Sequence, residues 1–348
     1  ASCACRYFKK CWYTIIMEQH FYPKDCLIVQ PQRARRAIES AIEQDSSKGN
    51  NKMGFIIQRL KELFFSTNNY YNTLMEAMEK VNSSQGLLHT IILAEGDHHL
   101  LTAKDSSHKL NYLETNNSLA IQCPVKIVGA PGVDKGRIII FGGIEWNTGE
   151  NQKFEDSCLD FWKFHLENVT LRNKSGYGLV AQLPFTIKNV IIEECGKDGI
   201  FAKWRTAIGE CKDLEVRYCK GNGIKAAFDA EITLLGRGTL VHDNCSRQFG
   251  YHIAGLLCEH GKFTTIRCIY PLTKEIVSTN NTQMNNVGQY QWASTYCHNF
   301  YATNGSNVDI SEIRIKNVSK ADSVRSANGV LHVPKDIVSL EDAYEKIL

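Results

Sequence analysis

The spacing of apolar side chains divides the chain into two parts that meet near Gly86. Before this point, apolar residues recur every three to four positions, as on one face of an amphipathic helix, in three stretches: 33–44, 53–65 and 72–81. After it, the apolar runs are as short as strands, and Gly, Asn and Asp interrupt them. The pattern therefore predicts a helical segment followed by a segment rich in β-strands.

A repeat within the second part indicates how its strands are arranged. Residues 165–172, 187–194 and 212–218 resemble one another, and each segment precedes a glycine that is followed by an apolar residue. These glycines, at 178, 199 and 223, lie 21 and then 24 residues apart. A period of about 20–25 residues is typical of one coil of a parallel β-helix. We therefore expect a mainly β fold, a parallel β-helix solenoid, rather than a sandwich of two sheets.

Stacked coils place equivalent side chains about 4.8 Å apart, so the repeat also predicts ladders of like residues. We expect an aliphatic ladder of Val169, Val190 and Val216, a turn ladder of Asn168, Asn189 and Asp213, and a cysteine ladder of Cys195, Cys219 and Cys245. Asx side chains suit turns because they can hydrogen-bond the backbone. The cysteines can be interpreted as a redox or metal site, but small buried fillers explain their positions without such chemistry.

Both ends of a solenoid need a cap. Residues 72–81 precede the first strand, and 338–348 carry the same Ser/Thr-Leu-x-x-Ala pattern after a strand-like stretch at 329–334. We predict a helical N-terminal segment at 1–70 and a β-helix with an N-terminal cap helix at 71–328. Residues 329–348 then form either a second cap helix or the start of a truncated second β-helix.

Three motifs add a family resemblance. They are Thr73-Leu-Met-Glu-Ala-Met78, Ile91-Ile-Leu-Ala-Glu-Gly-Asp-His98 and Val125-Lys-Ile-Val-Gly-Ala130. With the repeats, they make residues 74–275 resemble the right-handed parallel β-helix repeat (pectate-lyase-like) superfamily, especially the intracellular-type proteins of unicellular eukaryotes, algae and large DNA viruses. The resemblance implies a right-handed solenoid in the cytoplasm, or within a virion or large assembly. It does not imply a function, because the fold carries enzymes, adhesins and spacers.

Composition excludes several classes of function. The net charge of +3 is small for 348 residues, so no nucleic-acid partner is expected. No apolar run reaches the roughly 18 residues of a membrane span. The 13 cysteines are odd in number and spread along the chain, which favours reduced thiols in an intracellular protein. Cys3, Cys5, Cys11 and Cys26 lack the regular spacing of a zinc site, so we predict no metal and no cofactor.

The sequence also favours a protein without catalytic residues. Asp198, Asp229 and Asp243 fall at unequal offsets from their repeats, which indicates turn aspartates rather than one cluster of ligands. Residues 259–261 and 314–316 resemble the Gly-His-Gly and Arg-x-Lys elements of polygalacturonase-like hydrolases. The accompanying aspartate motifs are missing, although glycoside hydrolysis needs two carboxylates that flank the bond.

The remaining candidates are aromatic residues that can bind a partner from one flank of the solenoid. They are Trp204, Tyr251, Tyr290 and Trp292, the last two within a polar stretch, 277–301, that we interpret as an insertion. We expect a non-catalytic scaffold with protein partners or assembly neighbours. The alternative is a carbohydrate-active protein: a polysaccharide lyase, a hydrolase or a glycan binder. That alternative requires three carboxylates, or two with an Arg or Lys, to converge in one groove.

Overall fold

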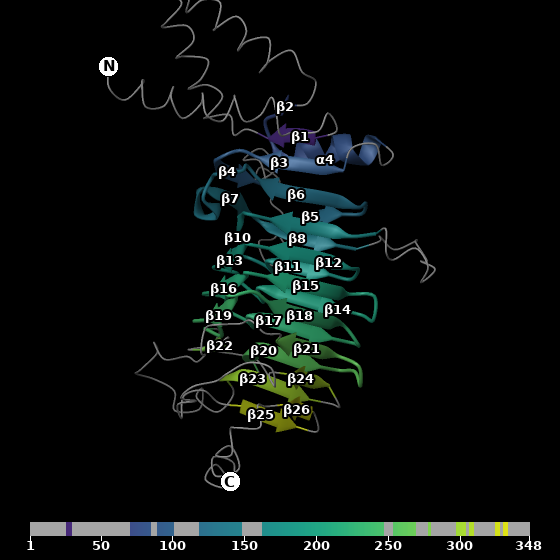
Figure 1. The fold of residues 1–348 in the computed structure, drawn as a ribbon, viewed down its shortest axis with the longest axis vertical. Coiled ribbons are helices and arrows are strands. Elements are labelled where there is room, and N and C mark those ends of the chain that lie inside the picture. Colours follow the sequence, from purple (N-terminus) through teal and green to yellow (C-terminus); the bar gives the residue numbers. More distant parts are fainter. Residues whose placement is uncertain are drawn as a thin grey trace, which may run out of the picture.

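The computed structural model describes residues 26–29, 70–84, 89–100, 118–147, 162–246, 253–268, 278–279, 297–303, 306–309, 324–327 and 330–332. Most of these residues belong to strands of three parallel sheets, A, B and C (Figure 1). Sheet A holds β1 (Cys26–Val29), β2 (Tyr70–Tyr71), β3 (Thr90–Leu93), β6 (Val125–Gly129), β9 (Phe164–Glu167), β12 (Phe185–Lys188), β15 (Ile208–Lys212), β18 (Glu231–Leu235), β21 (Thr265–Cys268), β24 (Asn307–Asp309) and β26 (Val330–His332).

Sheets B and C complete the framework. Sheet B holds β4 (Gly96–His99), β7 (Ile138–Phe141), β10 (Thr170–Arg172), β13 (Ile191–Glu193), β16 (Glu215–Arg217), β19 (Leu240–His242) and β22 (Ser278–Thr279). Sheet C holds β5 (Ser118–Ile121), β8 (Gly143–Trp146), β11 (Leu179–Ala181), β14 (Ile200–Lys203), β17 (Ile224–Ala227), β20 (Ile253–Glu259), β23 (Cys297–Thr303) and β25 (Val324–Ala327).

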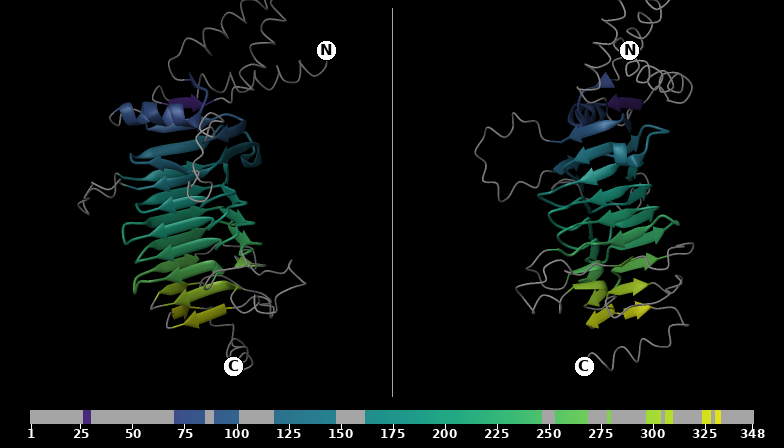
Figure 2. Two further views of the ribbon diagram at one scale, coloured as in Figure 1. Left: turned by 180° about the vertical axis from the view of Figure 1, so that it is seen from behind. Right: turned by 90° about the vertical axis from the view of Figure 1, so that its left-hand side faces the viewer.

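The chain visits the three sheets in turn, and each return adds a strand parallel to the one before it. From β12 it passes to β13 and β14, and it then returns to sheet A as β15, which pairs with β12 in register. Figure 2 shows the strands stacked along the long axis of the molecule. This arrangement is compatible with the predicted parallel β-helix, and one passage through sheets A, B and C is called a coil below.

Inward side chains of successive coils form the core, largely as the repeat predicts. Val169 and Val190 are fully buried and occupy equivalent positions in successive coils. The equivalent residue in the next coil is Leu214, because the residue after it, Glu215, donates its N–H to Val190 O. Val216 belongs to the adjacent ladder, opposite Ile192. The predicted aliphatic ladder is therefore wrong in its third member, although Val216 does face the core.

Three kinds of corner join the sheets, and at many of the described corners the chain uses a left-handed residue. At the A–B corner these are Asn168, Asn189, Asp213 and Gly236, with φ of 56°, 51°, 53° and 92°. At the B–C corner they are Glu194, Tyr218 and Asp243, with φ of 53°, 56° and 52°. At the C–A corner they are Trp204, Phe228 and His260, with φ of 79°, 56° and 53°. The A–B set confirms the predicted turn ladder, in which Asn189 Nδ2 donates to Asn168 Oδ1 at 2.9 Å.

The repeat glycines are required by close packing between coils. A Cβ on Gly178 would lie 2.5 Å from Gly199 O, and a Cβ on Gly199 would lie 2.7 Å from Gly223 O. The same two positions would meet the Sγ atoms of Cys195 and Cys219, which are buried beneath them. The equivalent atom below Gly223 is Asn244 Nδ2, so Asn244 replaces Cys245 as the third rung of the predicted cysteine ladder.

The described parts of the two ends differ from the predicted boundaries. Cys26–Val29 is a strand that pairs with β3, so the helical prediction for 1–70 is wrong at these residues, and the helices expected at 33–44 and 53–65 lie outside the described residues. Val330–His332 pairs with β24, so sheet A continues past residue 328. Residues 333–348, the rest of the predicted C-terminal element, lie outside the described part of the chain.

A helix, α4 (Leu74–Ser83), lies where the cap helix was expected, beside β1. Thr73 is its N-cap and accepts a hydrogen bond from Glu76 N, while Glu76 Oε2 accepts from Asn72 N. Its buried face consists of Leu74, Ala77, Met78 and Val81. No helix among the described residues is long and apolar enough to cross a membrane.

Candidate interaction surfaces

One outward ladder crosses six coils of sheet B. Its members occupy the same register position and are, in order, His99, Phe141, Arg172, Glu193, Arg217 and His242. The rings of His99 and Phe141 stack at 4.7 Å, and the Arg172 guanidinium lies 5.5 Å from the centre of the Phe141 ring. His98, the neighbour of His99, faces inward and bonds Ala94 O, as alternation on a strand predicts.

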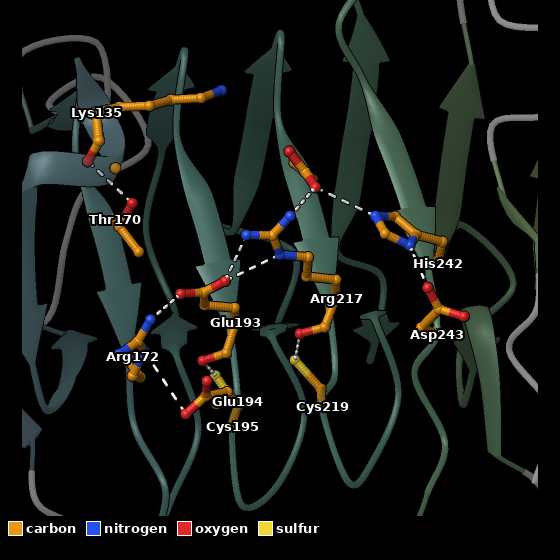
Figure 3. A network of polar contacts seen from close by, with 12 residues as sticks. Lys135, Thr170, Arg172, Glu193, Glu194, Cys195, Arg217, Cys219, His242 and Asp243 are labelled. Atoms are coloured by element: carbon orange, nitrogen blue, oxygen red, sulfur yellow. Dashed lines mark hydrogen bonds and ion pairs between the residues drawn. The ribbon is translucent and has the colours of Figure 1, made fainter. Parts of the chain in front are cut away.

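Glu193 is the centre of this sheet B ladder. Only 7% of its side chain is exposed, and it forms ion pairs with Arg172 in the preceding coil and Arg217 in the following coil (Figure 3). Burial raises the pKa of Glu193, but hydrogen bonds from the two arginines outweigh this effect and hold the pKa below its usual value. Glu193 is therefore a carboxylate whose charge is matched on both sides.

The ladder ends in a second set of polar contacts. Glu215 accepts a hydrogen bond from Arg217 at 2.7 Å and lies 3.2 Å from His242 Nε2. His242 Nδ1 lies 2.6 Å from Asp243 Oδ2. Lys135 approaches the same face, where burial lowers the pKa of its amine although Glu215 opposes this shift.

Charges of opposite sign thus alternate over three coils of sheet B, from Arg172 through Glu193 to Arg217, and join one coil to the next. Residues directly opposite each other on neighbouring strands stabilise a sheet when their charges are opposite and destabilise it when they are alike. The carboxylates Glu193 and Glu215 meet the numerical requirement of two acids with an arginine, but each is bonded to that arginine, Arg217. Glu193 is also bonded to Arg172, so both carboxylates are already engaged by arginines of the ladder, and this arrangement serves cohesion between coils.

A second cluster lies at and beside the start of the sheet C strands. Asp198 is buried, and its Oδ1 accepts hydrogen bonds from Asn222 N at 2.7 Å and Asn222 Nδ2 at 2.9 Å. Burial raises the pKa of Asp198, although the charge of Lys225 acts in the opposite direction. Lys225 forms an ion pair with Glu259. Two acids and a lysine therefore gather here as well, but Lys225 already has an acidic partner.

Aromatic rings accompany this sheet C cluster. Tyr177 and Phe201 contact each other with ring centres 5.7 Å apart. Lys197 Nζ lies 4.8 Å from the centre of the Tyr177 ring, and Lys225 Nζ lies 5.1 Å from that of Phe201. These are cation–π distances, so the lysines cover faces of both rings.

The third feature is the C–A corner ladder, which consists of Trp204, Phe228 and His260. The rings of Trp204 and Phe228 stack at 4.8 Å, and those of Phe228 and His260 stack at 5.3 Å. Trp204 is 48% exposed and Phe228 is 40% exposed. Two other exposed apolar residues are close in the chain, Ile208 at 51% and Phe263 at 63%. An exposed apolar group of this kind is a typical protein contact site.

Backbone conformation distinguishes the C–A corner from the A–B corner. A left-handed conformation costs a non-glycine residue about 1 kcal/mol or more, and bulky residues are rare there. At the A–B corner the same conformation is met by Asn, Asp and Gly, which tolerate it best. At the C–A corner it holds Trp204 and Phe228 with their rings toward solvent. Aromatic residues at these positions therefore carry a cost in backbone energy, which indicates that their side chains have a role of their own.

The described residues include one of the four predicted binding residues. Trp204 lies in the C–A corner ladder, whereas Tyr251, Tyr290 and Trp292 lie outside the described residues. Strands at 278–279 and 297–303 continue sheets B and C, so the insertion predicted for 277–301 is wrong at these residues, and 280–296 lie outside the described part of the chain. Sequence reasoning missed Phe228 and His260. A signal was present, because Trp204, Phe228 and His260 each follow a glycine (199, 223 and 255) by five residues.

The predicted turn aspartates have separate surroundings. Asp229 and Asp243 occupy left-handed positions at two different corners, and Asp198 is buried beside Asn222. Among the described residues, no group of three or more His, Cys, Asp or Glu side chains could hold a metal ion. Burial raises the pKa of the Cys219 thiol, which contacts Cys195, so this thiol resists ionisation.

In comparisons with known proteins, no family model, no curated protein and no solved structure matches the chain.

Proposed function

We propose that the protein is a non-catalytic scaffold, built on a right-handed parallel β-helix of the pectate-lyase-like kind, and that it binds protein partners in a large assembly through the C–A corner ladder. The observation that carries this proposal is the exposure of Trp204 and Phe228 from strained left-handed positions. Aromatic side chains are enriched in protein interfaces, where they supply much of the binding energy.

The stacking geometry favours a protein partner over a sugar. A sugar ring packs on the open face of an aromatic ring, but Phe228 has Trp204 against it on one side and His260 on the other. The ladder therefore offers mainly ring edges, which suit contacts with peptide groups and side chains. The paired charges of sheet B support the same proposal, because they make the solenoid a rigid platform.

Site-specific photo-crosslinking in the native source tests this function. A photoreactive phenylalanine analogue replaces Phe228 in one variant and Lys212, an exposed residue of sheet A, in the control. We expect a discrete cross-linked protein from position 228, and we expect Trp204→Asn to abolish it. Equal cross-linking from both positions, or none from position 228, would contradict the proposal.

The second candidate is a carbohydrate-active protein, and the sheet C cluster is the observation that favours it. Tyr177 and Phe201 lie beside two lysines. Asp198 is a buried carboxylate, although the neutral residue Asn222 occupies the equivalent position in the next coil. Affinity electrophoresis in gels containing polygalacturonate or a neutral glucan tests this function. Retardation that Tyr177→Ala removes would support it, and unretarded migration in both gels would reject it.

A further inference from the structure

We propose that the partner segment at the C–A corner is a short, acidic stretch of protein chain that also carries apolar side chains. This inference rests on the proposed function, and it adds the chemistry of the partner. Three features of the corner lead to it: the charges around the ladder, the parts of the rings that are presented, and the length of the exposed stripe.

Cations surround the ladder in excess. Lys203 precedes Trp204, Arg205 follows it, and Lys262 lies two residues beyond His260. None of these three cations forms an ion pair with another residue of the described part of the chain. Arg205 and Lys262 are exposed. They are therefore available to a partner.

The carboxylates of the same corner do not cancel this charge. Glu259 is paired with Lys225, so these two charges cancel. Asp229 Oδ1 accepts the backbone N–H of Phe263 at 3.0 Å, and Glu231 begins β18 beside Ile208. Three cations thus face two acids, which leaves one positive charge. Complementary charge steers partners and selects among them, so an acidic segment is favoured.

The orientation of the aromatic rings also favours an acidic partner segment. The face of an aromatic ring carries partial negative charge and its edge carries partial positive charge. Because the rings of the C–A corner ladder stack on one another, Phe228 presents its edge rather than its faces. Carboxylate oxygens are suited to such edges, whereas a cationic side chain would need a face.

The dimensions indicate a segment rather than a broad surface. Three rungs at about 4.8 Å spacing make a stripe about 10 Å long. Exposed Ile208 follows the turn that Ala207 N closes on Trp204 O, and exposed Phe263 bonds Asp229, the neighbour of Phe228, so both add apolar side chains beside the ladder. A stable interface between two folded proteins usually buries about 800 Å² on each side. A stripe of this length matches a few residues of an extended or helical peptide, whose apolar side chains can contact Ile208 and Phe263.

Selection from a random peptide library displayed on phage tests the inference. The full chain is immobilised, and the same selection is run in parallel on the variant Trp204→Asn/Phe228→Asn. Asn tolerates the left-handed conformation, so this variant keeps the corner backbone. We expect peptides that depend on the ladder and are enriched in Asp, Glu and large apolar residues. Arg205→Glu/Lys262→Glu should weaken a selected peptide by about tenfold or more, which corresponds to 1.4 kcal/mol, and the control Lys212→Glu should not.

The possible outcomes separate this inference from the proposed function. Peptides that depend on the ladder but are neutral or basic would overturn the acidic partner and leave docking at the corner in place. The absence of any ladder-dependent peptide would overturn both. In a second measurement, a fluorescent oligothymidylate should bind more weakly than the best acidic peptide. Tighter, ladder-dependent binding of the oligonucleotide would show that the corner reads a phosphate backbone, and it would also reject the inference.

Discussion

The sheet B ladder and the C–A corner ladder run along the same coils, yet they treat their side chains in opposite ways. On sheet B, Glu193 is bonded to Arg172 and Arg217, so the groups of the ladder satisfy one another. At the C–A corner, Trp204 and Phe228 are held in strained conformations and remain exposed. A satisfied ladder stabilises the fold, whereas the backbone strain of an exposed one offsets most of what its ring contacts contribute. The difference assigns cohesion to the first surface and binding to the second.

The largest change in stability is expected from Glu193→Gln, which breaks the sheet B ladder at its centre. The change keeps the shape of the side chain but leaves Arg172 and Arg217 without their shared anion. Removing one partner from a buried, charge-assisted network costs about 2 kcal/mol or more. We expect a lower midpoint of urea unfolding and unchanged binding of any partner at the C–A corner.

The matched control for this substitution is Glu194→Gln, the next residue. Glu194 has a side chain that is 39% exposed, and its Oε2 atom lies 3.5 Å from Lys174 Nζ and 3.7 Å from Arg172 Nε. Exposed ion pairs contribute about 0–1 kcal/mol. Equal losses of stability from the two substitutions would show that sheet B does not depend on the central position of Glu193.

The sequence could predict the coil because its signals are local and repeated. Asn168 and Asn189 mark a left-handed turn, and Gly178 and Gly199 mark the close approach of two coils. The error at Val216 is also instructive: a shift of two residues along a strand keeps a side chain on the same face, so hydrophobicity alone cannot detect it. Register had to come from pairing between strands, which places Val216 opposite Ile192.

The surfaces were harder to predict than the core. The partners Arg172, Glu193 and Arg217 are 21 and 24 residues apart, and they become neighbours only when the register is exact. Phe228 was overlooked because aromatic residues are not typical of left-handed turns, although its offset from Gly223 matches that of Trp204 from Gly199. Counting each position from its repeat glycine would have identified the three partners of sheet B as well as Phe228.

Substitution of Asp198 is expected to change stability less than Glu193→Gln does, and to raise it rather than lower it. Asp198 is a buried carboxylate that forms no ion pair with a described cation. Its raised pKa means that the folded state holds a proton more tightly than the unfolded chain does. Stability should therefore fall as pH rises from about 4, the unfolded value, through the folded pKa. Asp198→Asn keeps an oxygen for both hydrogen bonds from Asn222, so we expect it to remove this loss and to raise the free energy of unfolding at neutral pH.

Unfolding by urea at a series of pH values measures this effect. Glu193, with its lowered pKa, should show the reverse trend, because its contribution is present above about pH 4.3 and is lost as the pH falls further. The control is Asp213→Asn at the A–B corner, where Asn189 holds the same position one coil earlier. A curve for Asp198→Asn that follows the native protein at every pH would mean that Asp198 is not stabilised in its protonated form.

The smallest change in stability is expected from Trp204→Asn/Phe228→Asn. Each substitution relieves about 1 kcal/mol of backbone strain, and together they remove ring stacking of about 0.5–1.5 kcal/mol per pair. These terms nearly cancel, so the melting temperature should stay within a few degrees of the native value, as differential scanning calorimetry can measure. A large loss of stability would show that the C–A corner ladder, like the sheet B ladder, exists to hold coils together. The contrast between the two surfaces, and the binding role assigned to this one, would then fail.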